Sequence, residues 1–303
     1  MKNLFILILS LPFSLFSQTV DSNLVRSHLD YVVKECPNRY FGNISSLNKC
    51  SEYIFNEFNK YGDSTVYQNF EVDGLVYRNV ITSFGPSNGE RIIVGAHYDV
   101  CGDQDGADDN ASGTVGLLEL ARLLKEADLN KRIDLVAYSL EEPPYFRSEY
   151  MGSYVHARYL VDQGIPVYGM VCLEMIGYFN DERNSQHYPL KILKLIYGGK
   201  GNYITLVKRT GSGKMPRKFK RKFKRNKQLK TKSFTGPSKL TGIDFSDHLN
   251  YWALDIEAVM ITNTGFFRNK NYHQKTDKIE TLDINRMCGV IQQTYNTLLK
   301  MSN

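Results

Sequence analysis

One short stretch of the chain holds many of the groups that could bind a metal. Residues 95–113 read GAHYDVCGDQDGADDNASG, with one histidine and five aspartates among nineteen residues. The stretch overlaps the end of RIIVGAH, a run typical of a buried strand. Carboxylates are rarely buried without a positive partner. The stretch therefore indicates a bound metal, a basic partner or an acidic loop in solvent.

Other histidine and acidic residues follow the ends of further apolar runs. These are Glu141 and Glu142 after IDLVAYSL, Glu174 at the end of YGMVCLE, and His273 shortly after EAVMITNTG. Ligands of parallel sheets bind outside the carboxyl ends of the strands. We therefore expect these side chains to converge with His97 at one edge of a sheet.

The types of residue at this edge are those that zinc prefers. Imidazole nitrogen and carboxylate oxygen are common zinc ligands, and a catalytic zinc keeps one position open for water. Two neighbouring metals also need a shared carboxylate. Asp108 lies in a short loop before a helix and is our candidate for that bridge. Asp99, two residues after His97 in extended chain, is expected to orient the imidazole.

Each of these residues has a simpler interpretation when it is taken alone. A single His97 is most often a hydrogen-bonded core residue, and the acidic loop is most often a solvated turn. A calcium loop of the EF-hand type fails on spacing. Counted from Asp103, the sixth residue is Asp108, where glycine is required, and the twelfth is Thr114, where glutamate is expected. The combination of residues is far more specific than any one of them.

The elements that must position these residues alternate between strands and helices. The sequence predicts a hairpin over 64–84, strands over 91–97, 132–140, 167–177, 193–199 and 257–262, and helices over 113–127, 152–163, 245–254 and 282–301. Near-continuous apolar strands between amphipathic helices are typical of a mostly parallel sheet covered on both faces. We predict an α/β fold with a mostly parallel mixed sheet, as a single domain over residues 18–303.

The N-terminal segment indicates an exported protein, which bears on how its cysteines are interpreted. Residues 1–17, MKNLFILILSLPFSLFS, have the pattern of a signal peptide, and the apolar run is too short for a membrane span. We expect a periplasmic or extracellular location. Cys36 and Cys50 are the pair considered for a disulfide, with both the bridged and the free state left open. Cys101, Cys172 and Cys288 are interpreted as small buried thiols.

Positive charge is concentrated in one segment. Residues 208–232 contain thirteen Lys or Arg and no acid, whereas the remainder has 25 basic against 32 acidic residues. Met215, Phe219 and Phe223 are spaced by four, which favours an amphipathic helix with its lysines in solvent. The alternative is a patch for anionic glycans, nucleic acid or membrane surfaces. We expect at most weak polyanion binding and no stable nucleic-acid complex.

Taken in order, GAHYD, GADDNASG, EE, LEMIGYF, SDH and YH resemble the M28 family of zinc peptidases. This family includes dizinc aminopeptidases and relatives of glutamate carboxypeptidase II, and the resemblance covers roughly residues 30 to 300. It implies the phosphorylase/hydrolase-like fold of zinc exopeptidases. It also implies a secreted metallopeptidase, most simply an aminopeptidase, with two zinc ions and a peptide substrate.

The resemblance also assigns roles to single residues. The metal ligands it implies are Asp108 as the bridge, Glu142 and His273 on one zinc, and His97 and Glu174 on the other. Glu141 is then the general base and Tyr272 stabilises the oxyanion. The family often has a cis bond at the position of Asp108-Asp109. In SDH, Asp247 and His248 are expected to support the site from behind, and His248 is not assigned as a ligand.

Two departures from the family pattern affect the substrate. Glu174 stands where many relatives have aspartate. The loop PPYFRSEYM after the glutamate pair is longer than in the familiar aminopeptidases and brings Tyr145, Phe146 and Arg147 toward the expected cleft.

Two other functions are alternatives to a peptidase for this sequence. A glutaminyl-peptide cyclotransferase has the same fold with a single zinc, so that metal content separates the two enzymes. A non-catalytic polyanion-binding protein would bind in a strongly salt-dependent way and would not need Glu141.

Overall fold

The structure is a computed structural model that describes residues 18–303. The predicted signal peptide, residues 1–17, lies outside the described residues. Within residues 18–303, none of the helices is long and apolar enough to cross a membrane.

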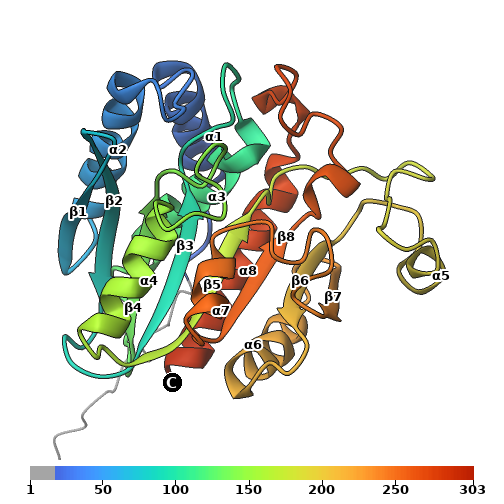
Figure 1. Ribbon diagram of the computed structural model, residues 1–303. Coiled ribbons are helices and arrows are strands. Elements are labelled where there is room, and N and C mark those ends of the chain that lie inside the picture. The colour runs from blue at the N-terminus through green and yellow to red at the C-terminus, as the bar shows by residue number, and fades with distance from the viewer. Residues whose placement is uncertain (1–17) are drawn as a thin grey trace, which may run out of the picture.

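The described residues fold around an eight-stranded mixed sheet (Figure 1). In spatial order the strands run β1-β2-β4-β3-β5-β8-β6-β7. Their bounds are β1 Ser64–Val72, β2 Leu75–Phe84, β3 Arg91–His97, β4 Arg132–Tyr138, β5 Val167–Glu174, β6 Ile204–Arg209, β7 Thr231–Gly236 and β8 Ala258–Thr262. The central four, β4-β3-β5-β8, are parallel to one another, whereas β2 and β6 pair antiparallel at their flanks. The predicted mostly parallel mixed sheet is confirmed.

Helices cover both faces of this sheet. Their bounds are α1 Ser22–Asp30, α2 Ile44–Asn59, α3 Ser112–Leu124, α4 Gly152–Asp162, α5 Leu193–Tyr197, α6 Lys214–Arg225, α7 His248–Ala253 and α8 Ile284–Ser302, with short helical turns η1 Tyr31–Glu35, η2 Ala107–Ala111, η3 Gly265–Phe267 and η4 Ile279–Thr281. One apolar core joins the sheet to α1, α2, α3, α6 and α8, and a second joins it to α4 and α7. Because both faces are covered, the central strands are apolar along most of their length.

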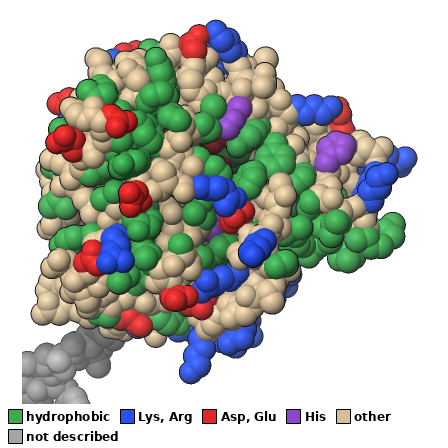
Figure 2. Space-filling model, in the orientation of Figure 1, with side chains coloured by type: hydrophobic (Ala, Val, Ile, Leu, Met, Phe, Trp, Pro, Cys, Tyr) green, Lys and Arg blue, Asp and Glu red, His purple; other side chains and the backbone are tan. Residues whose placement is uncertain are grey.

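The strand predicted over 193–199 is wrong. Leu193–Tyr197 form the short helix α5, which projects from the body of the protein (Figure 1). Leu195 and Ile196 are 82% and 69% exposed, and Figure 2 shows hydrophobic side chains gathered there. An apolar run becomes a strand only where the sheet offers a neighbour. Here the sheet is extended instead by β6 and β7, which the sequence analysis did not predict.

The basic segment contains the predicted amphipathic helix, α6. Met215, Phe219 and Phe223 are buried against the core, and the two phenyl rings stack with their centroids 5.6 Å apart. Burying each such side chain stabilises the folded protein by about 1.5–3 kcal/mol. The lysines and arginines of α6 gather at the lower edge of the molecule in Figure 2. Weak polyanion binding by this face stays a prediction.

Cys36 and Cys50 are both fully buried and are free thiols in this structure. The contact with Cys36, together with burial, raises the pKa of Cys50, and the same contact lowers the pKa of Cys36. The two thiols therefore lie in contact, as their sequence spacing allows, without being bridged.

Candidate metal centre

The carboxyl ends of the central strands bring two histidines and one aspartate together. His97 ends β3, Asp109 lies in η2 just beyond it, and His273 follows β8. Oδ1 of Asp109 is 3.5 Å from Nε2 of His97, and Oδ2 is 3.3 Å from Nε2 of His273. The two oxygens of one carboxylate thus face two different imidazoles, which is the arrangement that a carboxylate shared between two metals requires.

Three glutamates complete the cluster. An oxygen of Glu142 lies 3.1 Å from Nε2 of His273, while oxygens of Glu174 and Glu141 lie 3.4 and 3.8 Å from Nε2 of His97. Glu174 is held in place by Ser246, whose hydroxyl donates to its carboxylate at 2.7 Å. All of these carboxylates are buried. The fold therefore brings Glu141, Glu142 and Glu174 together with His97 and His273, as their positions at strand ends predict.

Asp99 lies behind His97, where the sequence analysis expected it. Nδ1 of His97 is 3.2 Å from the main-chain oxygen of Asp99 and 3.4 Å from its Oδ1. The Asp99 carboxylate also accepts the backbone N–H groups of Glu141 and Glu142 at 3.2 and 3.1 Å. Asp99 thus ties the orientation of the imidazole to the segment that carries the glutamate pair.

The aspartate that faces both histidines is Asp109 and not Asp108, the residue that the sequence suggested as the bridge. One oxygen of Asp108 accepts two backbone N–H groups, of Gly177 and Tyr178, at 2.9 and 3.1 Å. The other accepts the amide groups of Asn263 and Asn269 at 2.7 and 2.8 Å. These donors use both oxygens of Asp108 and turn them away from the histidines. The cis bond likewise joins Asp109 and Asn110, one position later than predicted.

The residues of the cluster fit a bound metal. Among the described residues, four buried atoms at its centre have no hydrogen-bond partner, namely Nε2 of His97, Oδ2 of Asp109, Oε1 of Glu142 and Nε2 of His273. Buried polar atoms are normally paired, and buried charges are paired or coordinate metals. The unpaired atoms are nitrogen and carboxylate oxygen, the donors that suit zinc.

The electrostatics of the cluster point the same way. Burial raises the pKa of Glu142 to about 7, with repulsion from Asp109 adding to the shift, and burial also raises the pKa of Glu141 well above its usual range. Burial alone would lower the pKa of His97 and His273, but the surrounding carboxylates raise both. Contact with the two histidines lowers the pKa of Asp109 instead, and a bound metal cation would favour the deprotonated form of all these groups.

A row of aromatic rings leads from the long loop after Glu142 to the cluster. It comprises Phe146, Phe245, Phe266, Tyr272 and His273, whose successive ring centroids are 5.7, 5.8, 5.6 and 3.8 Å apart. Burial and the nearby carboxylates raise the pKa of Tyr272, so its hydroxyl keeps its proton. The longer loop thus does bring Phe146 toward the site.

The other two loop residues singled out in the sequence have different surroundings. Arg147 packs over Phe146 and Phe245 and pairs with Asp244 at 2.7 Å. Tyr145 instead contacts Phe41 and donates to Asp73.

The two SDH residues behave differently from each other. Asp247 is fully buried, burial raises its pKa to about 7, and His97 is close enough to oppose that shift. His248 donates from Nε2 to the Ile243 carbonyl at 2.8 Å and stacks edge-on against Trp252. Asp247 therefore lies buried near His97, whereas His248 belongs to the core.

Some residues that hold the site were missed in the sequence. Asp277 accepts the backbone N–H groups of Asp108 and Asp109 at 3.0–3.1 Å, and burial with repulsion from Asp108 raises its pKa to about 8. Asn110 accepts the N–H of Met175 and donates to the Leu173 carbonyl. Asp277 follows His273 by four positions in a polar segment, KTDKIE, which gives no local signal of burial.

The sequence and the fold are similar to those of known proteins. The sequence profile of peptidase family M28 matches residues 79–297. The Escherichia coli (strain K12) protein YfbL is 41% identical over 279 residues, covering 88% of this chain and 85% of YfbL. Among solved structures, the Legionella pneumophila LapA aminopeptidase gives a TM-score of 0.72 at 20% identity, covering 93% of this chain and 72% of LapA.

A cyclase has the same fold. Porphyromonas gingivalis glutaminyl cyclase gives a TM-score of 0.68 at 20% identity, covering 93% of this chain and 99% of the cyclase. At these identities the likeness shows the fold, which an aminopeptidase and a cyclase share.

Proposed function

The chain belongs to peptidase family M28, and we propose that it is a two-metal exopeptidase that removes residues from the amino end of peptides. The observation that carries the proposal is the position of Asp109, whose two oxygens face His97 and His273 at 3.5 and 3.3 Å. In this proposal Asp109 is the shared ligand, His97 and Glu174 complete one zinc site, and Glu142 and His273 complete the other.

The reaction requires the protein to move one proton and to stabilise one developing charge. A metal pair supplies an acidified water and polarises the substrate carbonyl. Glu141 accepts the water proton and delivers it to the leaving nitrogen. Its carboxylate lies 3.8 Å from Nε2 of His97, farther than the carboxylates of Asp109 and Glu174 at 3.5 and 3.4 Å. The Tyr272 hydroxyl, which keeps its proton, donates to the oxyanion.

The aromatic row supports a preference for apolar side chains next to the cleaved bond. Phe245 and Phe146 are half-buried, and Phe266 is 38% exposed. Exposed and half-buried rings beside a cluster of charged groups form the kind of mixed surface that ligand sites use for orientation and specificity.

The test separates the base from the metal ligands. Glu141→Gln keeps the shape of the side chain and removes its basicity, so kcat for an aminoacyl anilide should fall by roughly 10²–10⁴-fold while metal content is retained. The matched control is the adjacent Glu142→Gln, which should lose metal as well as rate. The base is misassigned if Glu141→Gln stays active, or if it is the variant that loses metal. Peptides with free and acetylated amino ends then test for the aminopeptidase, since only the free form should be cleaved.

The cyclase is a second candidate because the structural match to P. gingivalis glutaminyl cyclase covers 99% of that enzyme and the loop after Glu142 is long. Mass spectrometry of a peptide beginning with glutamine distinguishes the two reactions, because cyclisation releases ammonia and leaves every peptide bond intact. A purified chain with two zinc ions supports the peptidase, and a chain with one supports the cyclase.

We also propose that the enzyme is exported after removal of residues 1–17, on the strength of the apolar N-terminal run. Sequencing the amino end of the protein from a producing cell should give a chain that begins at Gln18. A chain that retains Met1 contradicts this.

A further inference from the structure

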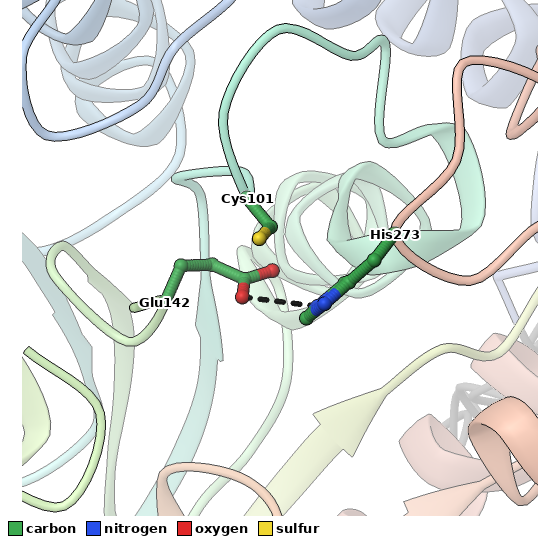
Figure 3. Close-up of side chains that lie close together, drawn as sticks. All are labelled: Cys101, Glu142 and His273. Carbon is green, nitrogen blue, oxygen red and sulfur yellow. Dashed lines mark ion pairs between the residues drawn. The ribbon is translucent and has the colours of Figure 1, made fainter. Parts of the chain in front are cut away.

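The thiol of Cys101 lies among the atoms assigned to one of the two metal sites. Cys101 is in the loop after β3, Glu142 follows β4 and His273 follows β8 (Figure 3). Its Sγ, a Glu142 carboxylate oxygen and a His273 ring nitrogen all lie within 4.8 Å of one another. Figure 3 shows the sulfur next to one oxygen of Glu142 and the imidazole of His273 next to the other. Three segments far apart in the sequence thus place three different donor types at one point.

Two buried atoms beside the thiol have no hydrogen-bond partner. Within the described part of the chain, Oε1 of Glu142 and Nε2 of His273 have no hydrogen-bond partner. Glu142 is only 4% exposed, so water does not readily satisfy this oxygen. Oε2 of Glu142 is 3.1 Å from Nε2 of His273, but the buried Oε1 has no donor, and a cation bound beside it would supply the missing partner.

We propose that Cys101 is a fourth protein ligand of the metal bound by Asp109, Glu142 and His273. The inference rests on the proposed metal site and adds a ligand to it. Around a tetrahedral zinc, with bonds of about 2.0–2.3 Å, ligand atoms lie roughly 3.5 Å apart. Nε2 of His273 is already 3.1 Å from Glu142 and 3.3 Å from Asp109. Because Sγ lies within 4.8 Å of a Glu142 oxygen and a His273 nitrogen, a small movement of its side chain would let it join these ligands, and the thiol proton would leave to solvent when the metal binds.

A fourth ligand makes the two metal positions unequal. The position beside Cys101 has four protein ligands including a sulfur, whereas the other has three, His97, Asp109 and Glu174. Sites with four protein ligands are closed, and sites with three keep a position for water. The open position for water then lies on the His97 side, next to Glu141. A thiolate also favours zinc over harder metals such as manganese.

The proposal is tested on the full mature chain loaded with Co²⁺ in place of zinc. A cysteine ligand gives an intense thiolate-to-cobalt absorption band in the near ultraviolet, separate from the weaker visible bands of cobalt with nitrogen and oxygen ligands. We expect this band in the unmodified protein and its complete loss in Cys101→Ser. The matched control is Cys288→Ser, which removes a half-buried thiol from α8 and should leave the band unchanged.

A second measurement does not depend on the variant folding. Bound Co²⁺ should slow the alkylation of Cys101 by iodoacetamide at least tenfold in the unmodified chain, as mapped by mass spectrometry, without protecting Cys288. Two bound cobalt ions with no thiolate band, or equal alkylation of Cys101 with and without metal, overturn the Cys101 assignment alone. A chain that binds no cobalt overturns both this assignment and the proposed metal site.

Discussion

Asp108 and Asp109, in the loop after β3, should have opposite effects when each is changed to asparagine. Asp108→Asn should mainly lower stability, and Asp109→Asn should mainly remove metal binding. Asp108 accepts from four N–H donors, two on each carboxylate oxygen. Asparagine keeps one oxygen and turns its NH₂ group toward two donors. Two lost bonds to a buried carboxylate, at about 1.5–3 kcal/mol each, give a loss of roughly 3–6 kcal/mol. This is a large part of the 5–15 kcal/mol typical of a domain.

Asp109→Asn removes no hydrogen bond of that kind, because the Asp109 side chain faces the two histidines instead. Although burial opposes it, contact with these histidines lowers the pKa of Asp109. We therefore expect Asp109→Asn to lose less than half as much unfolding free energy as Asp108→Asn. It should nevertheless abolish binding of at least one metal ion, since the shared carboxylate is gone.

The assay is urea unfolding followed by circular dichroism in the presence of a chelator, so that metal binding does not contribute to stability. Metal content is measured separately on chelator-free protein. The reasoning is refuted if Asp109→Asn is the more destabilised variant, or if Asp108→Asn has normal stability and loses its metal.

Three further predictions follow from other parts of the structure. Phe219→Asp buries an unpaired charge and should lower the free energy of unfolding in urea by at least about 3 kcal/mol. Lys220→Ala on the same helix should change it by less than about 0.5 kcal/mol. Equal effects of the two changes would contradict the docking of α6 on the core. Burial lowers the pKa of His156 from 6.5 to about 4. Between these two pH values the unfolded chain binds a proton that the folded protein does not, so the free energy of unfolding falls as the pH drops, by roughly 3 kcal/mol in total. His156→Asn should flatten this part of the urea-derived stability profile, and an unchanged slope would rule the histidine out. Phe245→Ala should lower kcat/KM for leucyl and phenylalanyl anilides about tenfold more than for the alanyl anilide, and a uniform decrease would mean that the aromatic row does not contact the substrate.

The sequence was enough to locate the site because the central strands are parallel. His97, Glu174 and the glutamate pair all follow apolar runs, and parallel strands bring such positions to one edge. The ends of the apolar runs in the sequence were therefore enough to predict that these side chains lie together. His273, eleven positions beyond the end of β8, was found through the family resemblance as well as through its strand.

The choice between Asp108 and Asp109 could not be made in the same way. Adjacent side chains in an irregular loop point in different directions, and here the donors that fix the direction come from remote segments. The residues that bind Asp108 are Gly177, Tyr178, Asn263 and Asn269, at least 69 positions away along the chain. The failed strand at 193–199 has a similar cause, since a local apolar run says nothing about whether a neighbouring strand is available.

Arg39 gives the N-terminal segment a part in the site. Its side chain is fully buried and donates to the carbonyl groups of Tyr98, Asp105 and Gly106 at 2.7–2.8 Å. These carbonyls frame the loop that carries Cys101 and leads to Asp109, yet the family profile begins only at residue 79. The boundary defined by sequence similarity is therefore not the boundary of the folding unit. A chain shortened to the matched region would leave these three carbonyls without their donor, so the edge of the sheet that carries the cluster depends on an N-terminal segment that the profile does not include.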